Sequence, residues 1–226
     1  MDERFLAKKS GSYANHLMPW VVFDTEASRQ ISCFCDEEDA ERFAAFKNEQ
    51  VKVVAKVLPD DTYEDDCEHP GKFVTWHRRR NLGDINYPHH EDFLDSVSEH
   101  AIQIPIYIYE HGSIALSVGG PAVACQFDSG QVGVWVFEPD ECKEIWGPKS
   151  DEWEGKAYEF AKAMCEYLTD VYNGNVWGFV IESGGGEVED SCWGFVGDNA
   201  LEDMKDNVEE KYHKLLEQAW EDRFGF

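Results

Sequence analysis

The cysteine and histidine side chains are the first candidates for chemistry, because both residue types bind zinc. The candidates all lie within the first 90 residues and are Cys33, Cys35, Cys67, His69, His77, His89 and His90. Zinc sites usually place the members of a ligand pair about two to four residues apart, whereas only one residue separates Cys33 from Cys35. No second pair with that spacing completes a tetrahedral set. The sequence therefore favours free thiols and loop histidines, and it predicts no metal and no cofactor.

A basic cluster, His77-Arg78-Arg79-Arg80, follows Trp76 in a strongly acidic part of the chain. Arginine binds phosphate or carboxylate groups through two parallel hydrogen bonds, so this cluster is able to hold an anion. Nearby carboxylates would compete with any added anion for the same guanidinium groups. We therefore favour internal ion pairs over an anion site.

Two further polar patterns are compatible with catalysis. The glycine-rich segment Phe127–Gly133 contains Asp128 and Ser129, although a turn whose side chains bond its own backbone explains it more simply. Asp24 and Glu26 are two residues apart, and a strand places such residues on one face. A metal-dependent hydrolase of nucleotides or phosphoesters that uses Asp24, Glu26, His77 and Asp128 is the alternative function.

Runs of carboxylates are the most abundant pattern in the sequence. The partner-binding candidates are Asp60, Asp61, Glu64, Asp65 and Asp66 in one segment and Glu202, Asp206, Glu209 and Glu210 in another. Duplex DNA carries one negative charge per roughly 1.7 Å of its axis, and carboxylates on helices and loops are able to imitate that spacing. The simpler interpretation is that such runs are solvated surface. Their number and their spread along the chain favour a binding surface.

The net charge of the whole chain limits the classes of molecule that it is expected to bind. Acidic residues outnumber basic ones by 46 to 20, which gives a formal charge of −26. Such a charge opposes direct binding to nucleic acid or to an anionic membrane, and it suits a basic partner. A negative surface also favours solubility, and charge alone does not separate the two explanations. No apolar run reaches the roughly 18–20 residues that span a bilayer, so no membrane contact is predicted.

Seven cysteines, an odd number, and the lack of a secretory segment at the start of the sequence predict free thiols in a reducing cytoplasm. The aromatic and hydrophobic content is high enough for a folded core. Apolar periodicity predicts strands at 19–25, 51–58, 73–76, 102–109, 114–118, 132–137, 176–181 and 190–196, and helices at 36–48, 92–99, 151–168 and 200–223. Residues 1–12 are expected to be loose or to form an edge.

These patterns predict a single α+β domain over residues 1–226. We expect it to contain a central antiparallel sheet, a few amphipathic helices and a long C-terminal helix. Residues 102–137, which begin with the alternating strand 102–109 and contain the next two predicted strands, are expected to form the centre of the fold. A glycine turn at residues 184–186 predicts a hairpin between the last two strands.

Four segments together carry a resemblance to a known family. They are HRRRNLGD at 77–84, IPIYIYEHGSIALSV at 104–118, FDSGQVGVWVF at 127–137 and VWGFVIE…DSCWGFVG at 176–197. These segments resemble a family of small phage and prophage-encoded proteins. The resemblance implies a viral or mobile-element setting in a host cytoplasm, and it implies no catalytic activity. Phages encode acidic inhibitors of restriction and CRISPR nucleases, so this setting agrees with the charge.

The leading hypothesis is therefore a non-enzymatic acidic accessory protein encoded by a phage. It would bind a basic host protein or nucleoprotein complex that handles nucleic acid. There it would inhibit a defence nuclease, as an anti-CRISPR or anti-restriction protein, by DNA mimicry. The metal-dependent hydrolase is the alternative, and a virion or assembly component is a further one.

Overall fold

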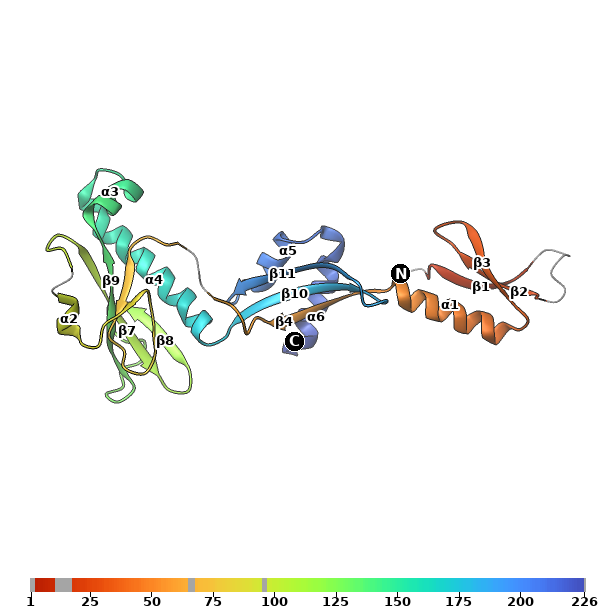
Figure 1. Ribbon diagram of the computed structural model, residues 1–226, viewed down its shortest axis with the longest axis horizontal. Helices are drawn as coiled ribbons and strands as arrows, with labels where there is room; N and C mark the ends of the chain where they lie inside the picture. Colours follow the sequence, from red (N-terminus) through yellow and green to blue (C-terminus); the bar gives the residue numbers. More distant parts are fainter. Residues whose placement is uncertain (1–2, 11–17, 65–67, 95–96, 226) are drawn as a thin grey trace. The chain divides into compact units, whose positions relative to one another are not determined.

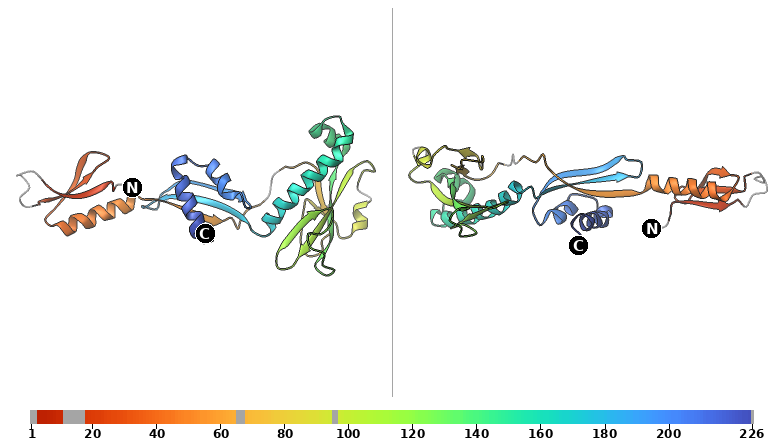
Figure 2. Two further views of the ribbon diagram at one scale, coloured as in Figure 1. Left: turned by 180° about the vertical axis from the view of Figure 1, so that it is seen from behind. Right: turned by 90° about the horizontal axis from the view of Figure 1, so that it is seen from below.

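The computed structural model describes residues 3–10, 18–64, 68–94 and 97–225, and it shows an α+β fold (Figures 1 and 2). The chain groups into two compact units. The first unit consists of Met1–Leu58, Gly178–Trp193 and Leu201–Phe226, and the second consists of Pro59–Trp177 and Gly194–Ala200. That residues 1–226 act as one domain stays a prediction. Within the described residues, no helix combines the length and the apolar character needed to cross a bilayer.

The N-terminal part of the first unit is a small sheet with one helix. Antiparallel strands β1 (Phe5–Lys9), β2 (Trp20–Asp24) and β3 (Arg29–Phe34) are followed by helix α1 (Glu37–Val51). Asp36 caps α1 by accepting a hydrogen bond from the backbone N–H of Asp39 at 2.9 Å. The helix buries Ala40 and Ala44 in a core with the strands. Strand β1 lies in the segment expected to be loose or to form an edge, and it is an edge strand of this sheet with one buried side chain.

A second sheet has the order β11-β10-β4, with β4 at Val53–Pro59, β10 at Val176–Ser183 and β11 at Val188–Val196. Strands β10 and β11 are joined by the predicted glycine turn, in which the N–H of Ser183 donates to the carbonyl of Glu187 at 2.9 Å. Both strands contain Trp-Gly-Phe, and the structure gives a reason for one of the glycines. A Cβ on Gly178 would lie 2.2 Å from the ring of Trp193, so the glycine makes room for that indole.

The C-terminal segment is helical but interrupted. Helix α5 (Ala200–Asp206) is followed by a short 3₁₀ turn, η3 (Glu210–Tyr212), and by helix α6 (His213–Phe224). The single uninterrupted helix expected over residues 200–223 is therefore wrong in length. Asn207 ends α5 because its side-chain amide donates to the carbonyl of Asp203 at 2.8 Å. The break also shifts the buried face, because Leu216 is fully buried and Leu215 is not.

The second unit is built on the predicted central sheet, whose order is β6-β5-β9-β7-β8. The strands are β5 (Lys72–Thr75), β6 (Ile85–Asn86), β7 (Ile102–Glu110), β8 (Ile114–Val118) and β9 (Ser129–Phe137). All neighbours are antiparallel except β5 and β6, which are parallel. Ile104, Ile106 and Ile108 are buried while Gln103 and Pro105 are exposed, so the alternation predicted for this strand is confirmed.

The helical elements described with this sheet are α2 (His90–Leu94), α3 (Pro139–Trp146), the 3₁₀ turn η2 (Ser150–Glu152) and α4 (Trp153–Tyr172). Helix α4 packs on β7 and β8 through its buried face, which includes Ala157, Ala161 and Cys165. Burial raises the pKa of Cys165 to about 12, so this thiol stays protonated at neutral pH. Asn173, just after α4, accepts from the N–H of Ile114 at 2.8 Å and donates to its carbonyl at 2.7 Å.

Candidate functional site

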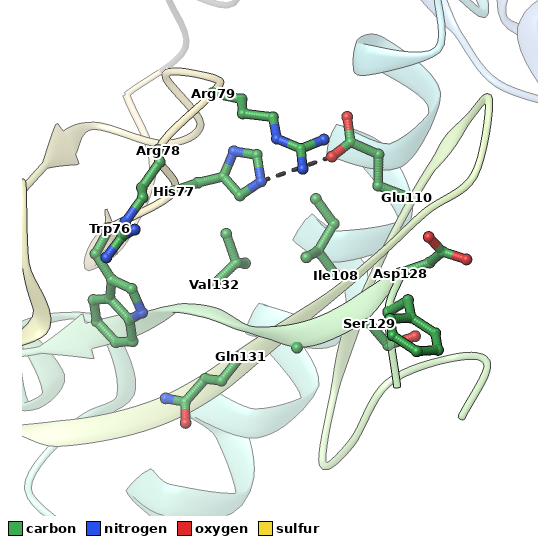
Figure 3. Close-up of a pocket in the computed structure, with 12 residues that line it drawn as sticks. Trp76, His77, Arg78, Arg79, Ile108, Glu110, Asp128, Ser129, Gln131 and Val132 are labelled. Carbon is green, nitrogen blue, oxygen red and sulfur yellow. Dashed lines mark ion pairs between the residues drawn. The ribbon is translucent and has the colours of Figure 1, made fainter. Parts of the chain in front are cut away.

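A pocket of about 320 Å³ in the second unit brings together segments that are distant in sequence (Figure 3). It lies between the loop after β5, the end of β7 and the start of β9. Its lining residues are Trp76, His77, Arg78, Arg79, Ile108, Glu110, Phe127, Asp128, Ser129, Gly130, Gln131 and Val132. We call this site the arginine pocket. It unites parts of the segments 77–84, 104–118 and 127–137.

The loop that carries the arginines, residues 76–84, is fixed at its base by the residues that end it. The hydroxyl of the buried Thr75 donates to the carbonyl of Leu82, and the N–H of Phe73 donates to Oδ2 of Asp84 at 2.7 Å. Gly83 has a φ of +83°, and a Cβ there would lie 2.5 Å from the Phe73 carbonyl oxygen. The Asn-Leu-Gly-Asp sequence therefore anchors the loop, which presents the preceding arginines outward.

The arginines differ in their partners. Arg80 Nε donates to Oε1 of Glu110 at 2.9 Å, and His77 Nε2 lies 3.8 Å from the other oxygen of the same carboxylate. Figure 3 shows His77 pointing toward Glu110 across the pocket. Arg78 and Arg79 are exposed and form no ion pair within the described part of the chain. The expected internal pairing is thus confirmed for Arg80, whereas the described chain contains no such pair for Arg78 or Arg79.

The glycine-rich turn on the other side of the pocket is held by its own side chains. Ser129 Oγ donates to the carbonyl of Val123 at 2.5 Å, and Cys125 Sγ donates to Oδ2 of Asp128 at 3.3 Å. His111 Nδ1 lies 3.5 Å from the same carboxylate oxygen. Ser129 therefore bonds the backbone of the turn, as the simpler interpretation expected, whereas the carboxylate of Asp128 contacts the side chains of Cys125 and His111 instead.

Asp24 and Glu26 form an ion-pair cluster with Arg4 in the first unit. Arg4 donates to both carboxylate oxygens of Asp24, at 3.1 and 3.0 Å, and its Nη1 lies 2.5 Å from Glu26 Oε2. The hydrogen bonds from Arg4 and from the Ala27 N–H hold the pKa of Asp24 below its ordinary value. His77 and Asp128 belong to the second unit. Of the four residues in the hydrolase hypothesis, Asp24 and Glu26 thus pair with Arg4, while His77 and Asp128 have other partners in the second unit.

The Asp24 cluster predicts a pH dependence of stability. A carboxyl group whose pKa is lowered by folding stabilises the fold above its unfolded pKa of about 3.9, and that contribution is lost as the pH falls through the folded value. We expect the unfolding midpoint of Asp24→Asn to fall less steeply below about pH 4 than that of the unchanged chain. Thermal unfolding monitored by circular dichroism from neutral to acid pH measures this. Parallel curves for the two proteins would contradict the assignment.

Several of the zinc candidates that the structure describes have other contacts. Cys33 Sγ accepts a hydrogen bond from Gln30 at 2.8 Å, and His69 Nε2 lies 3.4 Å from Asp84. His90 packs on the ring of Trp76 with 4.5 Å between centroids. Cys67 lies outside the described residues. Among residues 3–10, 18–64, 68–94 and 97–225, no three His, Cys, Asp or Glu side chains are grouped as metal ligands.

The first acidic segment lies in the second unit, directly after β4. Asp61 and Glu64 are exposed, and neither has a basic partner among the residues that the structure describes. Asp60 is half-buried, and its Oδ1 accepts from the hydroxyl of Thr62 at 3.1 Å. Asp65 and Asp66 lie outside the described residues. We call residues 60–66 the acidic loop.

The second acidic segment, residues 202–210, runs from α5 to η3 in the first unit and is called the acidic helical segment. Two of its four candidates are neutralised, because Glu202 pairs with Lys205 at 3.1 Å and Glu209 pairs with Lys211 at 3.0 Å. Hydrogen bonds from Lys205 to Glu217 and Glu202 raise the pKa of Lys205, so the ammonium stays charged. Asp206 and Glu210 are exposed and have no basic partner in the described chain.

Sequence reasoning missed Glu110, which lies in a segment noted only for its strand pattern and carries no motif. It named the segment Phe127–Gly133, but not its position beside the arginines. That position depends on the antiparallel pairing of β7 with β9, which sets Tyr109 opposite Ser129. No protein-family model, no curated protein and no solved structure matches this chain.

Proposed function

We propose that this chain is a phage- or prophage-encoded accessory protein that acts in the host cytoplasm. It binds a basic surface of a host nucleic-acid-handling complex and inhibits a defence nuclease, with carboxylates in the place of nucleic-acid phosphates. The observation that supports this proposal is the set of exposed carboxylates with no basic partner among the described residues, which includes Asp61, Glu64, Asp206 and Glu210.

The charge balance makes such a surface unavoidable. With 46 acidic and 20 basic residues, pairing every base with one acid would still leave 26 carboxylates unpaired. Mutual repulsion among these groups lowers the stability of the fold. A basic partner relieves that repulsion, because its cations neutralise the carboxylates in the complex. This gives a physical reason for such a chain to bind a cationic groove.

Asp206 illustrates a local cost of the acidic surface. It is the last residue of α5, where the helix dipole places partial negative charge. A carboxylate at this end is unfavourable by roughly 0.3–1 kcal/mol, and a lysine would be favourable there. Asp206 therefore destabilises α5, and a cation bound beside its carboxylate would offset that cost.

Exposed aromatic rings supply contacts that charge alone does not. Phe127 in the second unit is 92% exposed, and Trp193 in the first is 45% exposed. Aromatic residues are frequent energetic centres of protein interfaces, because they bury a large area with few rotatable bonds. Each unit thus offers an aromatic ring as well as unpaired carboxylates.

A capture experiment tests the proposal. The purified chain is immobilised and incubated with host lysate that has been cleared of nucleic acid. We expect a basic nucleic-acid-binding protein to be retained at about 0.1 M salt and released at about 0.5 M, because screening weakens exposed charge pairs. A short DNA duplex is also expected to release it, because duplex and chain compete for one groove.

Polyglutamate on the same support is the control for simple ion exchange. The retained protein should be absent from the polyglutamate matrix, and expression of the chain should raise phage plating on a host that carries the corresponding nuclease. Retention that resists both salt and duplex DNA would show that the interface is not a nucleic-acid groove, and the proposal would then be wrong.

A further inference from the structure

We propose that the arginine pocket binds a nucleoside monophosphate, with the phosphate on Arg78 and Arg79 and the base against an aromatic ring. This inference is independent of the proposed function, because it assigns a site for an anionic small molecule on an acidic protein. It rests on four features of the pocket, namely two guanidinium groups that have no acidic partner in the described chain, two carboxylates with partners of their own, an apolar floor and an exposed ring.

The guanidinium groups of Arg78 and Arg79 are the cationic part of the site. Both side chains are exposed, both line the pocket and neither has an acidic partner in the described chain. They are consecutive residues on a loop whose base is fixed by Thr75 and Asp84. Figure 3 shows the guanidinium groups on opposite sides of His77, Arg78 beside Trp76 and Arg79 toward Glu110, so each offers its own planar pair of N–H donors for a phosphate in the pocket.

The two carboxylates in the pocket do not cancel these arginines. Glu110 is paired with Arg80 at 2.9 Å and lies 3.8 Å from His77. Asp128 accepts from Cys125 and lies 3.5 Å from His111. With Glu110 neutralised by a third arginine, the two remaining guanidinium groups keep the local charge positive. The pocket is therefore an electropositive site on a chain of charge −26.

The rest of the pocket suits a flat apolar group better than a free anion. Ile108 and Val132 are buried and form its floor, and Trp76 lies at one side (Figure 3). Phe127 lines the pocket with 92% of its surface exposed, so a face of its ring is free to stack with a base. The volume of about 320 Å³ lies at the lower end of the range for small-ligand sites, which fits a mononucleotide.

Titration calorimetry on the full chain tests this proposal with four nucleoside monophosphates, the corresponding nucleosides and inorganic phosphate. We expect at least one monophosphate to bind, its nucleoside and phosphate each to bind at least about tenfold more weakly, and Arg78→Ala/Arg79→Ala to weaken binding about 10- to 100-fold. Phe127→Ala is expected to weaken it about fivefold or more, because it removes one stacking ring. Arg78→Lys/Arg79→Lys should be intermediate, because it keeps the charge and loses the paired donors.

The matched control is Arg29→Ala/Arg42→Ala, which removes the same charge from exposed positions in the first unit. Arg29 lacks a partner in the described chain and Arg42 pairs with Glu38, and neither lines the arginine pocket. This control should bind like the unchanged chain, and circular dichroism should show that all variants are folded. The proposal is overturned if no monophosphate binds, if the control weakens binding equally, or if a single-stranded oligonucleotide binds far more tightly than any monophosphate.

Discussion

Replacing Asp60, Asp61 and Glu64 by lysine is expected to weaken binding of the basic partner by about 100-fold. Each reversal removes an attraction and adds a repulsion, so the three together change the net charge by six. At roughly 0.5 kcal/mol for each unit of exposed charge, the loss is about 3 kcal/mol, which corresponds to that factor. The dependence of binding on salt should also become shallower, because fewer ion pairs are formed. Biosensor titrations at several salt concentrations measure both effects.

The acidic helical segment requires a different variant. Glu202 and Glu209 hold lysines of their own, so a lysine at either position would repel Lys205 or Lys211 and disturb the fold. Asp206→Lys/Glu210→Lys avoids this because neither residue has a partner in the described chain. We expect this variant to weaken binding by roughly tenfold or more, with unchanged circular dichroism.

The matched control for the triple variant reverses three exposed carboxylates outside both acidic segments, namely Glu144, Glu154 and Glu159. All three belong to the second unit, as the acidic loop does. The control has the same net charge as the triple variant, so it should retain most of the binding if the acidic loop is a specific contact. Equal losses in the two variants would show that only total charge matters, and the assignment of the loop would be wrong.

Trp135→Ala is expected to lower the free energy of unfolding by about 3–5 kcal/mol, the range for a buried large aromatic residue. The side chain is fully buried, stacks on Phe73 with 5.4 Å between centroids and meets Phe160 edge-on at 5.7 Å. Its Nε1 donates to the carbonyl of Pro70 at 2.9 Å, so the substitution also leaves that acceptor without its donor. Urea denaturation followed by circular dichroism measures the change.

Phe127→Ala is the control for this substitution. Its ring is almost fully exposed, so its removal should change the free energy of unfolding by no more than about 0.5 kcal/mol. The same variant is expected to weaken nucleotide binding, which separates the pocket from the core. A loss below about 1 kcal/mol for Trp135→Ala would show that the core of the second unit tolerates a large cavity, contrary to the packing described above.

The sequence predicts those elements whose local pattern is strong. The alternation around Ile106 follows from one buried sheet face, and the helix near Ala161 follows from a repeat of three to four residues. Strand β1 has no such alternation, because Lys8 and Lys9 face solvent at the edge of a small sheet. The break after α5 is accompanied by a hydrogen bond from the Asn207 amide to the Asp203 carbonyl, and apolar periodicity does not reveal such a bond.

The arginine pocket was harder to predict from the sequence than the fold was. The His-Arg-Arg-Arg cluster is visible in the sequence, but its ion pairs depend on which carboxylate lies nearby in space. Arg80 meets Glu110 because β9 separates β5 from β7 in the sheet, and this order has no local signal. The acidic segments are recognisable in the sequence from their content of Asp and Glu. Which of their carboxylates are neutralised depends on lysines such as Lys205, whose partner Glu217 lies on another helix.

The position of β4 in its sheet has a consequence for biosynthesis. Strand β4 ends at Pro59, but its neighbour β10 begins only at Val176. During translation β4 therefore leaves the ribosome long before β10 is synthesised. Its backbone edge toward β10 stays unpaired while the intervening residues are made. The acidic loop follows this strand directly, and the mutual repulsion of its carboxylates would discourage nascent chains from joining edge to edge.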